Sequence, residues 1–139
     1  MVDPLRVRSM LDRLGAEITA LRRLAARSTE ELLGDDDLLA AVKYRFVIAI
    51  EVCIDAGRHI VASEGLRAPL DYADVFTVLA EASLLAADVT ADMRDTARFR
   101  NLLVHGYAQV DDDRVVEILR TRLDDLERFR VALAEAALR

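Results

Sequence analysis

The sequence predicts an all-α fold, an up-and-down antiparallel bundle of about five helices that forms one domain over residues 1–139. First, 53% of the residues are hydrophobic and 32% charged, while only five are glycine and two proline. This composition is rich in helix formers and poor in turn residues. Second, apolar residues recur every three or four positions along most of the chain. Third, the segments between periodic stretches are short, which favours antiparallel neighbours.

The first helix is expected to run from Asp3 to about Arg27. Asp3 can cap it, and Pro4 suits its first turn because a proline lacks the N–H that would be unpaired there. The segment Ser28–Asp37 combines cap residues with a glycine and a run of three aspartates. We expect this segment to form a turn that leads into the positive N-terminal end of the next helix.

A long central helix is expected from Leu39 until Gly65 and Pro69 end it. Its apolar residues form two adjacent rows at helical spacing, which indicates burial on two sides. Residues spaced by four form a separate polar stripe on this helix: Glu51, Asp55 and His59.

Three more helices complete the expected bundle. Asp71 can cap a shorter third helix, and Asp88 or Thr90 can start a fourth one that carries the stretch RFRNLLVHGY, residues 98–107. The acidic turn Asp111–Asp113 can then open a last helix. Its apolar residues keep one register along the segment: Val116, Leu119, Leu123, Leu126 and Leu133.

Charge and composition limit the functional classes. The formal net charge of −6 opposes loose, sequence-independent adhesion to nucleic acid, although the arginines between Arg94 and Arg122 can make the second half locally basic. No stretch approaches the apolar length of a membrane span, so we expect a soluble, cytoplasmic protein without membrane association. The single cysteine, Cys53, excludes an internal disulfide and is expected in the core.

Arg100 occupies an unusual place in the helix that carries RFRNLLVHGY. On a helical projection it lies in the middle of the apolar face, opposite a polar stripe formed by Arg94, Arg98, Asn101 and His105. A guanidinium buried without a counter-charge is costly, so an anion should lie nearby. Either a carboxylate of the central helix, Asp55 or Glu51, pairs with Arg100, or the arginine faces a cleft that receives a phosphodiester.

The end of this helix carries two further candidates. His105 precedes Gly106, which is expected to take the left-handed conformation and to end the helix. The unpaired carbonyl groups there favour the imidazolium, so His105 is either a proton carrier or an ordinary surface histidine. Tyr107 follows, with a hydroxyl that solvent or another enzyme can reach. His59 lacks a glutamate at the spacing of bundle metal sites, and we expect no metal and no cofactor.

Arg100, Asn101, His105 and Tyr107 together spell R-N-x-x-x-H-x-Y. This pattern resembles the signature of the HepT-like toxins of the HEPN superfamily, and the resemblance covers about the last two thirds of the chain. It implies a toxin that is a metal-independent endoribonuclease and a homodimer, with the motif arginine and histidine of both subunits in one RNA-binding cleft. It also implies a nucleotidyltransferase antitoxin that neutralises the toxin by attaching AMP to Tyr107. Asp55 matches an aspartate often found on the family's central helix.

The residues suit this chemistry. RNA is cleaved when its 2′-hydroxyl loses a proton and attacks the adjacent phosphorus, which needs a base, an acid and a cation but no metal. One subunit offers one such histidine, His105, and one such arginine, Arg100, so the hypothesis makes the dimer a catalytic requirement. Two alternatives remain open at this point: the protein is a non-catalytic dimeric helical binding module, or it is a nucleotide-binding regulator of a partner enzyme.

Overall fold

The computed structural model describes residues 2–137, and all the regular secondary structure of this part is helical, which confirms the all-α prediction. It contains seven α-helices and one short 3-10 helix. In chain order they are α1 Pro4–Ala25, α2 Thr29–Gly34, α3 Asp36–Ser63, α4 Tyr72–Glu81, α5 Ala87–His105, η1 Tyr107–Gln109, α6 Asp112–Thr121 and α7 Leu123–Ala137.

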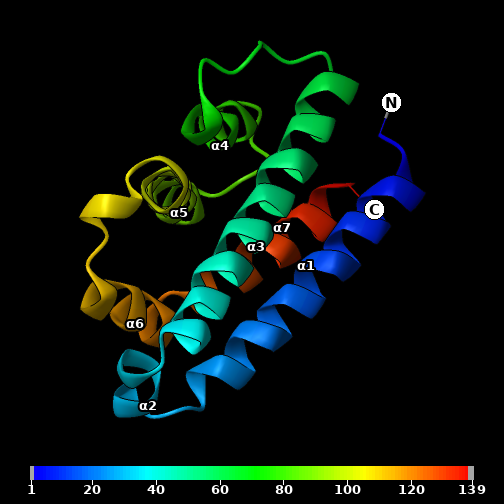
Figure 1. Cartoon of the computed structure of the whole chain (residues 1–139). Coiled ribbons are helices and arrows are strands. Elements are labelled where there is room, and N and C mark those ends of the chain that lie inside the picture. Colours follow the sequence, from blue (N-terminus) through cyan, green and yellow to red (C-terminus); the bar gives the residue numbers. More distant parts are fainter. Residues whose placement is uncertain (1, 138–139) are drawn as a thin grey trace.

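The long helices α1 and α3 lie side by side and run in opposite directions (Figure 1). Helix α7 packs against both of them. Helices α4 and α5 are seen nearly end-on in this view, so this second pair crosses α3 instead of running along it (Figure 1). Because α3 contacts α1, α4, α5 and α7, it forms the centre of the molecule, as its two apolar rows predict.

Helix α3 supplies much of the core. Its Cys53 is fully buried, as predicted, and burial raises the pKa of the thiol. Gly57 lets α3 and α4 approach closely, because a Cβ atom at this position would lie 2.8 Å from Cγ1 of Val75. Within residues 2–137, no helix is both long enough and apolar enough to cross a membrane.

Several predicted helix ends are confirmed. The carboxylates of Asp3, Asp71 and Asp111 accept hydrogen bonds from backbone N–H groups at the starts of α1, α4 and α6. Helix α3 ends before Gly65, whose φ of +64° is the left-handed conformation that favours glycine. The start of α5 differs from the prediction, because α5 begins at Ala87 without a side-chain cap.

The helix count exceeds the expected five at two places. The segment predicted as a turn contains α2, which is stabilised by a capping box in which Ser28 and Glu31 bond each other's backbone N–H groups. The predicted last helix is broken at Arg122 into α6 and α7. The side chain of Arg122 bonds the carboxylate of Asp125, three residues ahead, across this break. Helix α6 contacts α2, whereas α7 packs against α1.

Candidate active site at the end of helix α5

Helix α5 carries the predicted site, and its buried face is as the projection predicts. The helix packs against α3, α4 and α7 through residues spaced by three and four. Arg100 is the last buried member of this row and is only 8% exposed. Its position is therefore set by the core, after Met93 and Ala97, which are fully buried two turns and one turn earlier.

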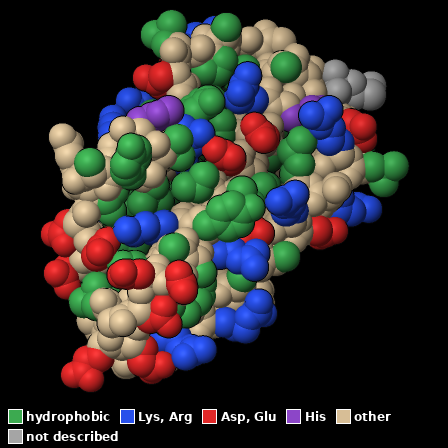
Figure 2. Space-filling view, viewed as in Figure 1, with side chains coloured by type: hydrophobic (Ala, Val, Ile, Leu, Met, Phe, Trp, Pro, Cys, Tyr) green, Lys and Arg blue, Asp and Glu red, His purple; other side chains and the backbone are tan. Residues whose placement is uncertain are grey.

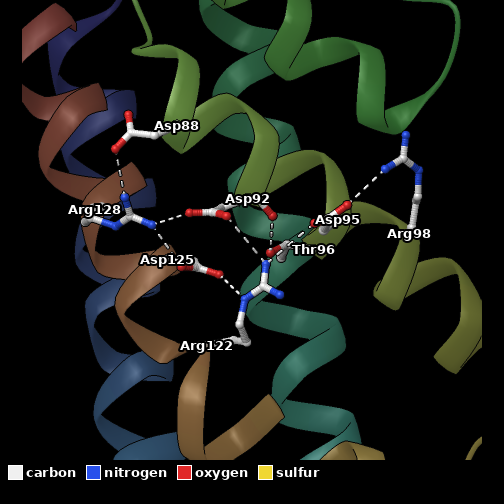
Figure 3. A network of polar contacts seen from close by, with 8 residues as sticks. All are labelled: Asp88, Asp92, Asp95, Thr96, Arg98, Arg122, Asp125 and Arg128. Atoms are coloured by element: carbon white, nitrogen blue, oxygen red, sulfur yellow. Dashed lines mark hydrogen bonds and ion pairs between the residues drawn. The ribbon is translucent and has the colours of Figure 1, made fainter.

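A network of charged side chains ties the first half of α5 to α7 (Figure 3). Asp88, Asp92 and Asp95 lie along one face of α5, and Arg122, Asp125 and Arg128 meet them from the break before α7 and from α7 itself. Asp125 is buried and accepts hydrogen bonds from both arginines. Hydrogen bonds to the aspartates raise the pKa of both arginines. The largest cause is Asp125 for Arg122 and Asp92 for Arg128.

This network fixes α5 before the motif begins. The network is not among the features predicted from the sequence, although the aspartates of α5 are spaced by four and three and so share one face. The partner arginines on α7 carry no comparable signal, because nothing in the spacing indicates which helix they meet.

Arg100 forms the predicted ion pair with the central helix. Its Nη2 donates to Oε1 of Glu51 at 2.7 Å, and its Nη1 donates to Oδ1 of Asn101 at 3.2 Å. The guanidinium also lies over the ring of Tyr72, with its central carbon 5.0 Å from the ring centroid. Of the two carboxylates considered for the pair, the structure selects Glu51. Asp55 is exposed and makes no hydrogen bond to Arg100, although both residues line one small pocket.

The bonding capacity of Arg100 is not exhausted by these contacts. A guanidinium has five N–H donors, and the hydrogen bonds above use two of them. Its buried Nε has no hydrogen-bond partner within residues 2–137. Arg100 also lines a pocket of about 210 Å³, together with Glu51, Asp55 and Tyr72. A buried arginine with spare donors beside a small polar pocket can bind a further anion.

His105 and Tyr107 lie on the surface. His105 is exposed at the last position of α5, and Tyr107, in the short helix η1, is 77% exposed. Neither side chain bonds another residue in the described part of the chain. His105 lies about 7.5 Å further along the helix axis than Arg100 and about 140° around it, so the two side chains of one chain point in different directions.

The prediction for Gly106 was wrong in its physical reason. The helix does end here, but the φ of Gly106 is −112°, which any residue adopts. Glycine is favoured because of space, since a Cβ atom would lie 2.9 Å from Cδ1 and 3.2 Å from the carbonyl oxygen of Leu102. The chain continues directly into η1, where Gln109 donates its N–H to the carbonyl of Gly106.

The predicted polar stripe divides into separate parts. Arg94 turns towards α4, where it donates to the hydroxyl of Thr77 and the carbonyl of Ala73. Asn101 joins Arg100, as described above. Arg98 and His105 therefore remain as the exposed polar members of the stripe, and Arg94 has a structural role in holding α4 against α5.

His59, where α3 meets the start of α1, has a structural partner. Its Nε2 accepts a hydrogen bond from the backbone N–H of Asp3 at 3.3 Å, which links α3 to the start of α1. Figure 2 shows imidazole side chains at two separate places on the surface. The two histidines of one chain therefore do not form a joint site. Among residues 2–137, no three histidine, cysteine, aspartate or glutamate side chains are grouped so that they could hold a metal ion.

Comparison with known proteins points to one family. Residues 14–133 match the family model described as "Ribonuclease HepT-like". The protein is also similar to "mRNA nuclease HepT" of Shewanella oneidensis, with 33% identity over 79 residues. That alignment covers 57% of this chain and spans 59% of the length of the relative.

Solved structures show the same fold. A tri-AMPylated HEPN toxin of Shewanella oneidensis, solved in complex with an MNT antitoxin, superposes with a TM-score of 0.87 at 24% identity, over 97% of this chain and 99% of that one. YutE of Bacillus subtilis, described as a cytosolic protein of unknown function, superposes with a TM-score of 0.82 at 16% identity, over 96% and 90% of the two chains. At these identities the likeness establishes the helical fold.

Proposed function

This chain belongs to the HepT-like ribonuclease family, and on that premise we propose that it is the endoribonuclease toxin of a toxin–antitoxin pair. The observation that carries the proposal is Arg100, a buried arginine that keeps spare N–H donors beside a small polar pocket. Retaining a buried charge with an unpaired Nε costs stability, and such a cost is typical of residues kept for function. The proposed place of action is the cytoplasm.

The proposed site needs two copies of the chain. Arg100 and His105 of one chain lie on different sides of α5, so one chain does not bring both to the same phosphate. A two-fold axis near the end of α5 would place these residues of two copies around a shared cleft. A homodimer would thus supply two imidazoles, one as base and one as acid, together with two guanidinium groups.

The proposed reaction needs no metal ion. One His105 imidazole removes the proton of the RNA 2′-hydroxyl, whose oxygen then forms a bond to the adjacent phosphorus. The second imidazole, as imidazolium, gives its proton to the departing 5′-oxygen, so the products are a 2′,3′-cyclic phosphate and a 5′-hydroxyl. Arg100 stabilises the extra negative charge on the phosphorane oxygens.

Tyr107 is the proposed site of control by the antitoxin. Its exposure of 77% leaves the hydroxyl open to a second enzyme. A partner nucleotidyltransferase would join this oxygen to the α-phosphorus of ATP, with release of pyrophosphate and of the phenolic proton. The attached AMP would place a phosphate two residues from His105, where it blocks the cleft and competes with RNA for the arginines.

Cleavage of RNA in the presence of a chelator tests the proposed activity. We expect the wild-type protein to cut total RNA in excess EDTA, and we expect His105→Ala to be inactive while keeping its helical circular dichroism. His59→Ala is the matched control, because it removes the other histidine of the chain. Equal inactivity of wild type and His105→Ala would contradict the proposal, and so would equal activity of the two.

A second candidate function is a dimeric binding module without catalysis. The ion pair between Arg100 and Glu51 favours it, because it gives the buried arginine a structural partner. Arg100→Lys separates the two possibilities. A lysine keeps the positive charge but not the planar fork, so cleavage should fall strongly while the protein stays folded and dimeric. A variant that unfolds or becomes monomeric would favour the binding module.

A further inference from the structure

A groove of about 420 Å³ lies beside the motif on the α6 side of helix α5. Phe46 and Ile50 of α3 line it, together with Phe99 and Leu102 of α5 and Ile118 of α6. The rings of Phe46 and Phe99 meet edge to face with centroids 5.3 Å apart. Phe46 is buried and so fixes the ring of Phe99, which remains partly exposed and forms an aromatic wall.

Arginines line the same groove from both sides. Arg98 of α5 and Arg114 of α6 are 59% and 53% exposed, and each is paired only with a carboxylate three residues away on its own helix. Exposed pairs of this kind contribute little free energy, so both arginines can exchange partners for a phosphate. Arg122 is different, because the aspartates in Figure 3 already surround it.

His105 lies one helical turn beyond Leu102, which lines the groove. Arg98, Leu102 and His105 are spaced by four and three residues and therefore follow one stripe of the helix. Side chains three apart on a helix have Cβ atoms about 5–6 Å from each other, so Leu102 at the groove adjoins His105. Figure 2 shows hydrophobic side chains at the surface between α5 and α6, with both basic and acidic side chains next to them.

We propose that this groove binds an unpaired nucleobase of single-stranded RNA, next to the phosphodiester that His105 acts on. The base would stack on Phe99, and flanking phosphates would lie at Arg98 and Arg114. This inference rests on the proposed function and adds the form of the substrate, because a base held in a duplex cannot enter the groove. An aromatic wall between exposed arginines is the pattern by which proteins hold single-stranded nucleic acid.

A second copy of the chain fits this groove less well. A two-fold contact centred on it would bring together Arg98 and Arg114 of both copies with their paired carboxylates, so it offers the arginines no net opposite charge. A nucleotide supplies both an aromatic face for the apolar wall and negative charge for the two arginines.

Binding of a 2′-O-methyl oligonucleotide tests the proposal without cleavage, because its blocked 2′-oxygen cannot attack. The probe is a single-stranded oligomer that contains one 2-aminopurine, whose emission falls when the base stacks on an aromatic ring. We expect wild type to quench the emission. Phe99→Leu should abolish the quenching and weaken binding about tenfold, as for loss of one stacked base. Tyr44→Leu, which replaces an exposed aromatic residue outside the groove, should bind as wild type does.

Salt dependence tests the arginines. Arg98→Gln should weaken binding several-fold at low salt and should reduce the slope of log K against log salt by about 0.7, as for one lost phosphate contact on a single strand. Arg130→Gln is the matched control, because Arg130 forms the same kind of pair with Glu127 on α7. Equal slopes for Arg98→Gln and Arg130→Gln would overturn the assignment of Arg98.

Two further results would overturn the groove assignment. One is equal binding by Phe99→Leu and Tyr44→Leu. The other is conversion of a dimer to a monomer by Phe99→Leu, which would show that a second copy covers the groove.

Cleavage assays distinguish failure of the groove assignment from failure of the proposed function. If wild type cuts RNA but binding does not depend on Phe99, only the groove assignment fails. If binding depends on Phe99 but wild type does not cut RNA, the proposed function fails and the groove stands.

Discussion

The ion pair between Arg100 and Glu51 predicts an asymmetric loss of stability when either partner is changed. The side chain of Arg100 is 10% exposed, whereas that of Glu51 is 40% exposed. Glu51→Gln keeps an acceptor but leaves a buried cation without its counter-charge. We expect this to lower the free energy of unfolding by about 1–2 kcal/mol, the lower part of the range for charged hydrogen bonds, because Glu51 is partly hydrated.

Arg100→Met should cost less. Methionine keeps the apolar stem of the side chain and removes the unpaired Nε, and the freed Glu51 can turn towards water. Replacing a buried charged group with an apolar one of similar shape is often nearly neutral, so we expect a change of about 0–1 kcal/mol. The order of the two variants is therefore the reverse of what a simple count of lost bonds would give.

Urea unfolding followed by circular dichroism at pH 7 measures this difference. Asp55→Asn is the control, because Asp55 lines the same pocket without bonding Arg100, and its change should stay within about 0.5 kcal/mol. In a thermal scan, each kcal/mol should shift the midpoint by about 3–5 °C for a chain of this size. If Arg100→Met loses as much stability as Glu51→Gln, Arg100 is a structural residue, and the argument that it is kept for function fails.

Three further changes test other parts of the structure. Gly57→Ala should lower stability by about 1–3 kcal/mol in urea unfolding, because the added Cβ would lie 2.8 Å from Val75; an unchanged midpoint would contradict the close approach of α3 and α4. Asp125→Asn should cost about 1–3 kcal/mol, because it leaves two arginines without their shared buried acceptor, and this loss should persist in 1 M salt. The hydrogen bonds from Arg67 lower the pKa of Asp74 from 3.8 to about 2. This contribution is complete above about pH 5 and is lost as the pH falls towards 1, so Asp74→Asn should be less stable than wild type at pH 7 and should match it below about pH 1.

The sequence predicts those features of the fold that depend on local rules. Asp3, Asp71 and Gly65 each mark a helix end through the chemistry of one side chain or one φ angle, and the structure confirms all three. The break at Arg122 is not predictable in this way. The apolar spacing continues through it without change, and the break depends on where α6 and α7 meet other helices.

The candidate site was predictable to a similar extent. The apolar projection places Arg100 on the buried face, and the structure confirms it. The choice between Glu51 and Asp55 as its partner depends on the height at which α5 crosses α3, which spacing within one helix does not give. Tyr72 was missed for the same reason, since a tyrosine at the start of a helix gives no sign that its ring lies under a guanidinium.

The two ends of the motif are positioned by different means, and this determines how a complete site can form. Arg100 is held by the core and by three neighbouring side chains, so its guanidinium has a fixed place at one side of α5. His105 is exposed at the other side of the same helix end, and Tyr107 is exposed in η1; neither side chain has a partner in residues 2–137. A phosphate at the imidazole of one chain is therefore far from the arginine of that chain around the helix. Under the proposed function, a second copy related by a two-fold axis at the end of α5 would offer each imidazole the arginine that its own chain holds on the other side of the helix.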